Sequence, residues 1–143
     1  MNESEIINGI KSALEKLKEN DKFLLETHQY ERTITHKLAE YMEPFFKEFD
    51  VDVEWNKGLD GKDQKMRLHG KDVWVVPDII VHNRKTGDKF VAIEVKLSRA
   101  STPVIEQDKV KLKEYKKQIK YKYAFLVIIG VSKQTGESEV IPI

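Results

Sequence analysis

The sequence contains no cysteine among its 143 residues, and this absence excludes both a disulfide framework and a thiolate metal site. Its four histidines never form a close i, i+4 pair, so we do not expect a zinc site. The sequence also lacks a glycine-rich phosphate-binding loop, a dinucleotide-binding fingerprint and a nucleophile elbow. The commonest signatures of nucleotide-binding proteins and serine hydrolases are therefore missing.

Long apolar segments are missing as well. The longest one, from Tyr123 to Val131, is far too short to cross a bilayer. The N-terminus, Met1 to Glu5, is acidic and lacks the basic-then-apolar order of a signal peptide. We therefore expect a cytoplasmic protein with no membrane partner. Its length predicts a single domain, residues 1–143, that is large enough for one hydrophobic core.

A strong charge of one sign is also missing, because the formal net charge is only +1. The two ends of the chain nevertheless differ. Residues 1–50 carry 7 basic and 11 acidic side chains, whereas residues 109–143 carry 8 basic and 3 acidic ones. A polyanion such as nucleic acid would therefore be met by a local surface and not by the field of the whole molecule.

Hydrophobic periodicity predicts an α/β protein that begins with an added amphipathic helix, within residues 1–20, packed on the core or on a second subunit. Thr27 is a candidate cap for the second helix. Residues 57–71 are predicted to be a mobile basic loop. The predicted helices cover 4–19, 28–46 and 102–120, and the predicted strands cover 51–56, 73–82, 90–97, 123–131 and 139–143.

Three charged residues interrupt the apolar hairpin that segments 73–82 and 90–97 are expected to form. Glu94 and Lys96 share one face of the second strand because side chains alternate along a strand. If the hairpin pairs about its turn, Asp78 lies opposite Glu94, with the two Cβ atoms about 5 Å apart. Carboxylates this close repel each other unless they share a proton or a divalent cation. The alternative interpretation is a solvent-facing Glu–Lys pair on an edge strand.

Pro77-Asp78, followed across a turn by Glu94-Val95-Lys96, resembles the signature of the PD-(D/E)XK nuclease superfamily. The resemblance implies a restriction-endonuclease-like αβββαβ core, in which helices flank a central mixed sheet. It also implies hydrolysis of phosphodiester bonds that depends on Mg²⁺ or Mn²⁺. Four segments within residues 27–116 resemble a group of small uncharacterised bacterial proteins in this superfamily: His28–Arg32, Thr35–Ala39, Pro77–His82 and Asp108–Leu112.

The resemblance assigns roles to individual residues of the hairpin. Asp78, Glu94 and the backbone carbonyl of Val95 are expected to bind the metal ion. Lys96 is expected to position or activate the attacking water.

Two acids on predicted helices are further candidates. Superfamily members often bring a glutamate from the first core helix to the site, and Glu31 fits because it falls inside the apolar stripe of that helix. Alternatively, Glu31 lies at the edge of the stripe and reaches water or pairs with Arg32. Asp108 lies on the apolar face of the later helix, where contact with Lys96 or Arg99 would support the site. Alternatively, that helix begins later and Asp108 is its N-cap.

Basic side chains near the hairpin and on the later helix are the candidates for contact with nucleic-acid phosphates. A solvated loop and a solvated helix face are the alternatives. The two tryptophans, Trp55 and Trp74, are interpreted as core or strand-face residues and not as base-stacking platforms. The candidate nucleic-acid contacts are Lys62, Lys65, Arg67, Arg99 and Lys111.

The sequence thus leads to a metal-dependent nuclease as the first functional hypothesis, with DNA favoured as the substrate by analogy with the superfamily. The rival hypothesis is a non-catalytic module that keeps this fold to bind nucleic acid or a protein. The complete set of Asp78, Glu94 and Lys96 favours the enzyme. A homodimer is expected by the same analogy.

Overall fold

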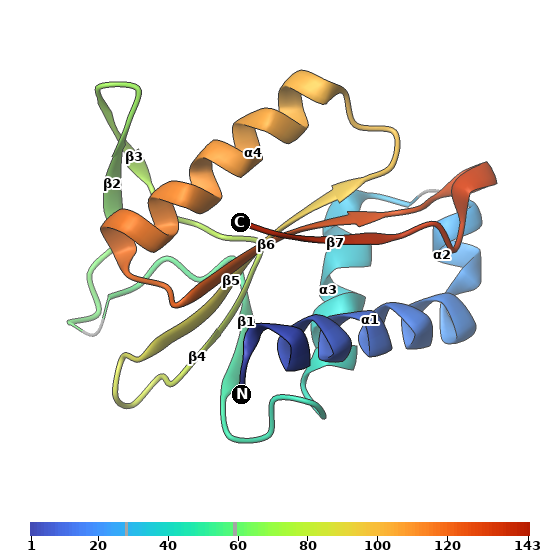
Figure 1. The fold of residues 1–143 in the computed structure, drawn as a ribbon, viewed down its shortest axis with the longest axis horizontal. Coiled ribbons are helices and arrows are strands. Elements are labelled where there is room, and N and C mark those ends of the chain that lie inside the picture. Colours follow the sequence, from blue (N-terminus) through green and yellow to red (C-terminus); the bar gives the residue numbers. More distant parts are fainter. Residues whose placement is uncertain (28, 59) are drawn as a thin grey trace.

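A computed structural model describes residues 1–27, 29–58 and 60–143 (Figure 1). In the described chain, three α-helices lie within the first 42 residues, and the elements that follow are mostly strands apart from one further α-helix. The helices are α1 (Glu3–Asn20), α2 (Lys22–Glu26), α3 (Glu31–Met42) and α4 (Thr102–Glu114), with a π-helical turn at Tyr115–Ile119 and a 3-10 turn at Ser132–Gln134. The strands are β1 (Asp50–Val53), β2 (Lys65–Leu68), β3 (Lys71–Trp74), β4 (Ile79–His82), β5 (Lys89–Leu97), β6 (Tyr123–Ile129) and β7 (Glu139–Pro142).

In the described residues, five strands form one mixed sheet in the order β1-β4-β5-β6-β7. Neighbouring strands are antiparallel except for β5 and β6, which are parallel. A parallel pair needs a crossover connection, which α4 supplies. The order α3-β1-β4-β5-α4-β6 is the expected αβββαβ order. The predicted α/β fold, a central mixed sheet flanked by helices, is therefore confirmed.

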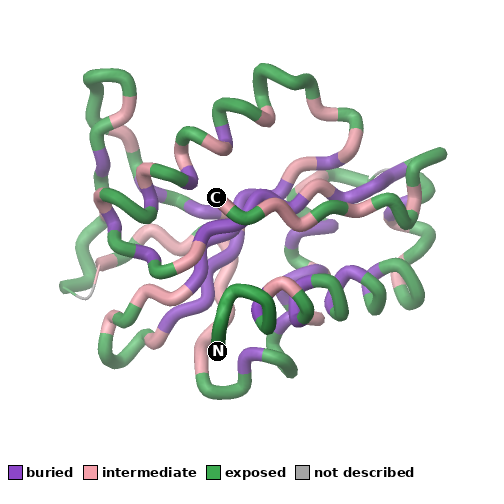
Figure 2. The backbone as a smooth tube through the Cα atoms, viewed as in Figure 1, coloured by how far each residue is buried: buried purple, intermediate pink, exposed green. Residues whose placement is uncertain are grey.

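Both faces of the sheet are covered, with α1 and α3 on one face and α4 on the other (Figure 1). Alternation along β5 sends Ile93 and Val95 into the cluster under α1 and α3, and Ala92 into the cluster under α4. The middle of the sheet is accordingly buried from both sides (Figure 2). Glu94 and Lys96 have the same parity as Ala92, so they lie on the α4 side.

The predicted N-terminal helix is present as α1, and it packs on the protein's own core. Asn2 forms a capping box with Glu5 at its start. Its buried residues, among them Ile6, Ile10 and Leu17, join the cluster that includes Ile93. No helix of the described chain is long and apolar enough to span a bilayer.

The second helix differs from the prediction. It begins at Glu31, and Thr27 ends the short helix α2 where the sequence suggested an N-cap. The Thr27 hydroxyl donates to the Phe23 carbonyl at 2.7 Å, so it serves the turn before it. The predicted start at His28 lies outside the described residues.

The predicted strand 73–82 is wrong as a single element. Pro77 interrupts it because proline has no N–H to donate to a ladder. Residues before Pro77 pair with β2, and residues after it pair with β1 and β5. The predicted loop 57–71 is wrong in its second half, where β2 joins β3 through His69 and Gly70, both with positive φ. We call the resulting hairpin, residues 65–74, the arm.

Candidate active site

The register of β4 against β5 brings the first two candidate acids together. Ile79 pairs with Ile93, so Asp78, one residue earlier, lies opposite Glu94. Asp78 Oδ2 accepts a hydrogen bond from the Val95 N–H at 2.7 Å. The hairpin geometry expected from the sequence is therefore present, although its first strand is shorter.

Glu94 is buried beneath α4, with only 2% of its surface exposed. The Tyr115 hydroxyl donates to its Oε1 at 2.8 Å. Burial, and then the charge of Asp78, raise the pKa of Glu94 well above its ordinary value. A carboxyl group in this position favours either a bound proton or a nearby cation.

Lys96 lies between two helical acids. Its Nζ forms ion pairs with both, at 3.2 Å from Asp108 Oδ2 and 3.5 Å from Glu31 Oε1. Burial lowers the pKa of the Lys96 amine, but the charges of Asp108 and Glu31 outweigh burial and raise it. The amine is therefore an ammonium at neutral pH, a donor of hydrogen bonds and positive charge.

Glu31 is the first residue of α3, and its side chain is 38% exposed. Its position is the edge of the helix's buried stripe and not its interior, as the alternative interpretation held. It still turns toward the site, where it pairs with Lys96 and not with Arg32. Burial is the main cause that raises the pKa of Glu31, and the charge of Asp78 adds to it.

Asp108 lies inside α4, which begins at Thr102 after Ser101 as N-cap, so the alternative of a later helix start at Asp108 is wrong. Its buried carboxylate contacts two lysines, Lys96 and Lys111. The contact between Asp108 and Lys96 that the sequence suggested is therefore present.

Sequence reasoning missed two residues that contact Glu94. Lys111 Nζ lies 3.4 Å from Glu94 Oε1 and 3.7 Å from Asp108 Oδ1, whereas the sequence placed it among surface contacts to phosphate. Tyr115 was not among the candidate site residues. The signal was present, because Asp108, Lys111 and Tyr115 are spaced i, i+3 and i+7 and so share one face of α4.

The other predicted phosphate contacts lie on two sides of the site. Lys62, Lys65 and Arg67 are exposed on the arm and at its base. Arg99 is exposed and lines a surface cleft together with Glu31 and Lys96. A second cleft, of about 160 Å³, lies between α3 and β1 and is lined by Glu31, Arg32, Thr35, His36, Val53, Glu54 and Asp78.

The predicted metal ligands are a small set of oxygen atoms. Among the described residues, no three His, Asp or Glu side chains are grouped closely enough to hold a metal ion. The Val95 N–H faces Asp78, and in a strand the carbonyl of the same residue points to the same edge. Two carboxylates and one carbonyl fit Mg²⁺, which keeps several waters and uses one or two carboxylates.

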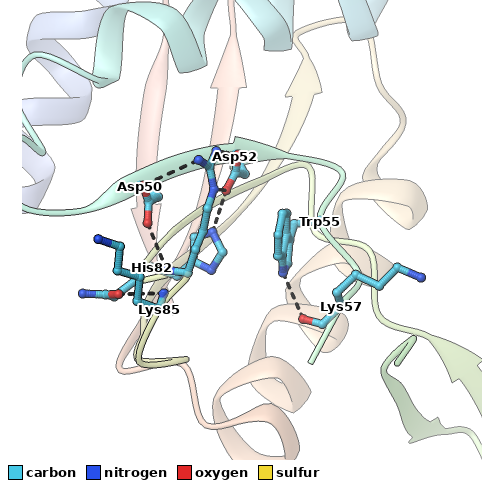
Figure 3. A network of polar contacts seen from close by, with 8 residues as sticks. Asp50, Asp52, Trp55, Lys57, His82 and Lys85 are labelled. Carbon is cyan, nitrogen blue, oxygen red and sulfur yellow. Dashed lines mark hydrogen bonds and ion pairs between the residues drawn. The ribbon is translucent and has the colours of Figure 1, made fainter. Parts of the chain in front are cut away.

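A second polar cluster lies at the opposite end of β4 and has a structural role (Figure 3). Asp52 Oδ2 lies 2.6 Å from His82 Nε2 and accepts from Arg84 Nε at 2.9 Å. The Trp55 ring packs edge-on against the His82 ring, with centroids 5.0 Å apart. These contacts join the edge strand β1 to β4 and to the turn that follows it.

No protein-family model matches the chain, and no curated protein matches it. Among solved structures, the crystal structure of SSO0001 is similar, with a TM-score of 0.39 and 17% sequence identity. The similarity covers 95% of this chain and 66% of that chain, so this chain spans just under two thirds of its length. The fold places the protein in the α/β class and goes no further. The side chains of the site are therefore the basis for inferring its function.

Proposed function

We propose that the protein is a metal-dependent nuclease of the PD-(D/E)XK type that hydrolyses phosphodiester bonds of DNA in the cytoplasm. The convergence of Asp78, Glu94 and Lys96 beside α3 and α4 supports this proposal. A solvent-facing Glu–Lys pair on an edge strand does not account for it. The strand β5 is central in the sheet, and Glu94 is buried.

Asp78, Glu94 and the Val95 carbonyl would hold Mg²⁺ or Mn²⁺, with Glu31 as a further oxygen donor at the edge of the site. When bound, the ion lowers the pKa of a coordinated water and offsets the charge of the phosphate. Tyr115 holds the Glu94 carboxylate in place through its hydroxyl.

Lys96 orients the water or the phosphate in this proposal and does not remove a proton. An amine whose pKa is raised by Asp108 and Glu31 stays charged at neutral pH, so it acts only as a donor. Asp108 and Glu31 fix the position of the ammonium. A developing negative charge on a phosphate oxygen would strengthen its hydrogen bond to Lys96.

The test is incubation of the protein with single-stranded, double-stranded and branched DNA and with RNA, each in Mg²⁺, Mn²⁺ or EDTA. We expect metal-dependent cleavage of at least one DNA substrate. Asp78→Asn and Lys96→Ala are expected to lower the rate by about 100-fold or more, because each removes a group that contacts the reacting atoms or the ion.

Asp88→Asn and Lys89→Ala are matched controls, since Lys89 is the first residue of β5 and Asp88 directly precedes it, at the far end of the strand from Lys96. They are expected to keep the wild-type rate. Equal cleavage by the wild type and all four variants would identify a contaminating nuclease. No cleavage of any substrate would contradict the proposal.

One observation favours the rival function, a binding module without catalysis. The ammonium of Lys111 lies against Glu94 and so supplies positive charge beside the carboxylate pair. If this amine replaces the metal permanently, Mg²⁺ will not change the melting temperature of the wild type, and nucleic acid will bind without being cleaved. A rise of the melting temperature with Mg²⁺ that Asp78→Asn abolishes would contradict the rival.

A further inference from the structure

The arm presents one face to solvent. Its register pairs Lys65 with Trp74 and Arg67 with Asp72, so these side chains share a face. Met66, on the opposite face, is buried in the cluster under α4. Burial of one face fixes which side chains the other face exposes.

Trp74 is 55% exposed, although the Lys65 ammonium lies 4.5 Å from the centre of its ring. The neighbouring strand of the arm forms a rigid support for the ring, because the Gln118 side chain makes two hydrogen bonds with the Arg67 backbone. The Arg67 N–H donates to Gln118 Oε1 at 2.8 Å, and Gln118 Nε2 donates to the Arg67 carbonyl at 2.7 Å. An exposed aromatic ring on a rigid support is a surface suited to stacking.

Charge and position both favour a nucleic acid as the occupant of this face. On this face Lys65 and Arg67 are basic and Asp72 is acidic, and Asp72 forms an ion pair with Arg67 at 3.1 Å. The arm's second strand leads through Pro77 directly to Asp78. Its buried face also shares a cluster with Tyr115, which contacts Glu94. A nucleic-acid strand lying on the arm would therefore continue toward the candidate active site.

We propose that the outer face of the arm binds single-stranded nucleic acid, with one base stacked on Trp74 and with Lys65 and Arg67 against neighbouring phosphates. The π-face of a base is free only where the base is unpaired, so this contact favours single-stranded or branched substrates over a continuous duplex. The preference for single-stranded or branched substrates rests on the proposed nuclease function. The binding of single-stranded nucleic acid to the arm does not.

The test measures binding in EDTA, where no cleavage occurs, with a fluorescein-labelled oligothymidylate and its duplex with oligoadenylate. We expect the oligothymidylate to bind more tightly than the duplex. Trp74→Ala is expected to weaken its binding by about 5- to 100-fold, the loss of one stacked base, and Trp74→Phe to restore most of it. Phe23→Ala is the control, because Phe23 is an exposed aromatic residue (71%) on α2, away from the arm.

The chain has two tryptophans, so Trp55→Phe leaves Trp74 as the only fluorescent indole. Oligothymidylate is expected to quench its emission, as a stacked base does. Unchanged binding by Trp74→Ala, tighter binding of the duplex, or no binding at all would overturn the proposal. These results are distinct from failure of the nuclease function. Quenching of Trp74 without any cleavage in Mg²⁺ would support the arm as a binding surface and contradict the nuclease function. Cleavage that Trp74→Ala does not affect would support the nuclease function and contradict the role of the arm.

Discussion

Glu94 shows how a single residue can be held where its charge is unfavourable. The carboxyl group is buried under α4, and Asp78 adds a second negative charge beside it. Tyr115 and Lys111 offset only part of this cost, since the pKa of Glu94 remains raised. Residues that serve a ligand often lower the stability of the protein without the ligand.

We predict that Glu94→Gln stabilises the protein in the absence of divalent ions. Because the folded-state pKa of Glu94 is raised above 4.5, its contribution to stability is present below that pH and is lost as pH rises through the folded value. The amide has no acidic proton to lose, so it stays uncharged as pH rises. We expect a melting temperature a few degrees higher at neutral pH, where about 1 kcal/mol corresponds to roughly 2–4 °C for a protein near this size.

Melting curves in EDTA across a pH series measure this effect. The wild type should lose more stability than Glu94→Gln as pH rises. Glu114→Gln, on the same helix, serves as the control. A lower melting temperature for Glu94→Gln at neutral pH would show that the charge of Glu94 is stabilising.

At the scale of elements, the edge strand β1 depends on the cluster at the far end of β4. It pairs with β4 alone in the five-stranded sheet of the described chain. Burial raises the pKa of Asp52, but hydrogen bonds from Arg84 and His82 outweigh burial and lower it. The cluster therefore stabilises the sheet only while Asp52 is ionised.

We predict that Arg84→Ala destabilises the protein by about 1 kcal/mol, a modest value because Arg84 is half exposed and its ion pair is screened by solvent. The depressed pKa of Asp52 gives a contribution that is present above 3.8 and is lost as pH falls through the lower folded value. Urea unfolding at neutral and acidic pH measures both effects. Lys85→Ala, on the neighbouring turn position, is the control, and an equal loss for both variants would contradict the prediction.

At the scale of the whole molecule, α1 is part of the main core and not an appendage. Ile6, Ile10 and Leu17 are fully buried in the cluster that covers one face of the sheet. Each such side chain contributes about 1.5–3 kcal/mol by burial. Their sum is comparable to the net stability of a small domain, about 5–15 kcal/mol.

We therefore predict that removal of residues 1–20 abolishes cooperative folding, whereas Ile10→Ala lowers stability by about 2–5 kcal/mol and leaves a folded protein. Circular dichroism during thermal unfolding measures both. Lys11→Ala, at an exposed position of the same helix, is the control. A truncated protein that still unfolds cooperatively would show that the sheet is stable without α1.

Much of the fold was predictable because local patterns determine it. The apolar face of α4, the alternation in β5 and the continuous apolar run of β6 each specify an element without help from the rest of the chain. The errors occur where the pattern is short or ambiguous. Residues 73–82 are mostly apolar, with Asp78 and His82 as the exceptions, yet Pro77 divides them. Residues 65–68 alternate over too few positions to distinguish a strand from a loop.

The sequence by itself determined that Asp78, Glu94 and Lys96 share one region, because strand periodicity and a short turn fix their relative positions. Only the tertiary structure decided that Lys111 and Tyr115 contact Glu94 and that Trp74 is exposed. These facts depend on how α4 and the arm pack on the sheet. Contacts between distant parts of a chain are set by packing of the whole core, which no local period of the sequence encodes.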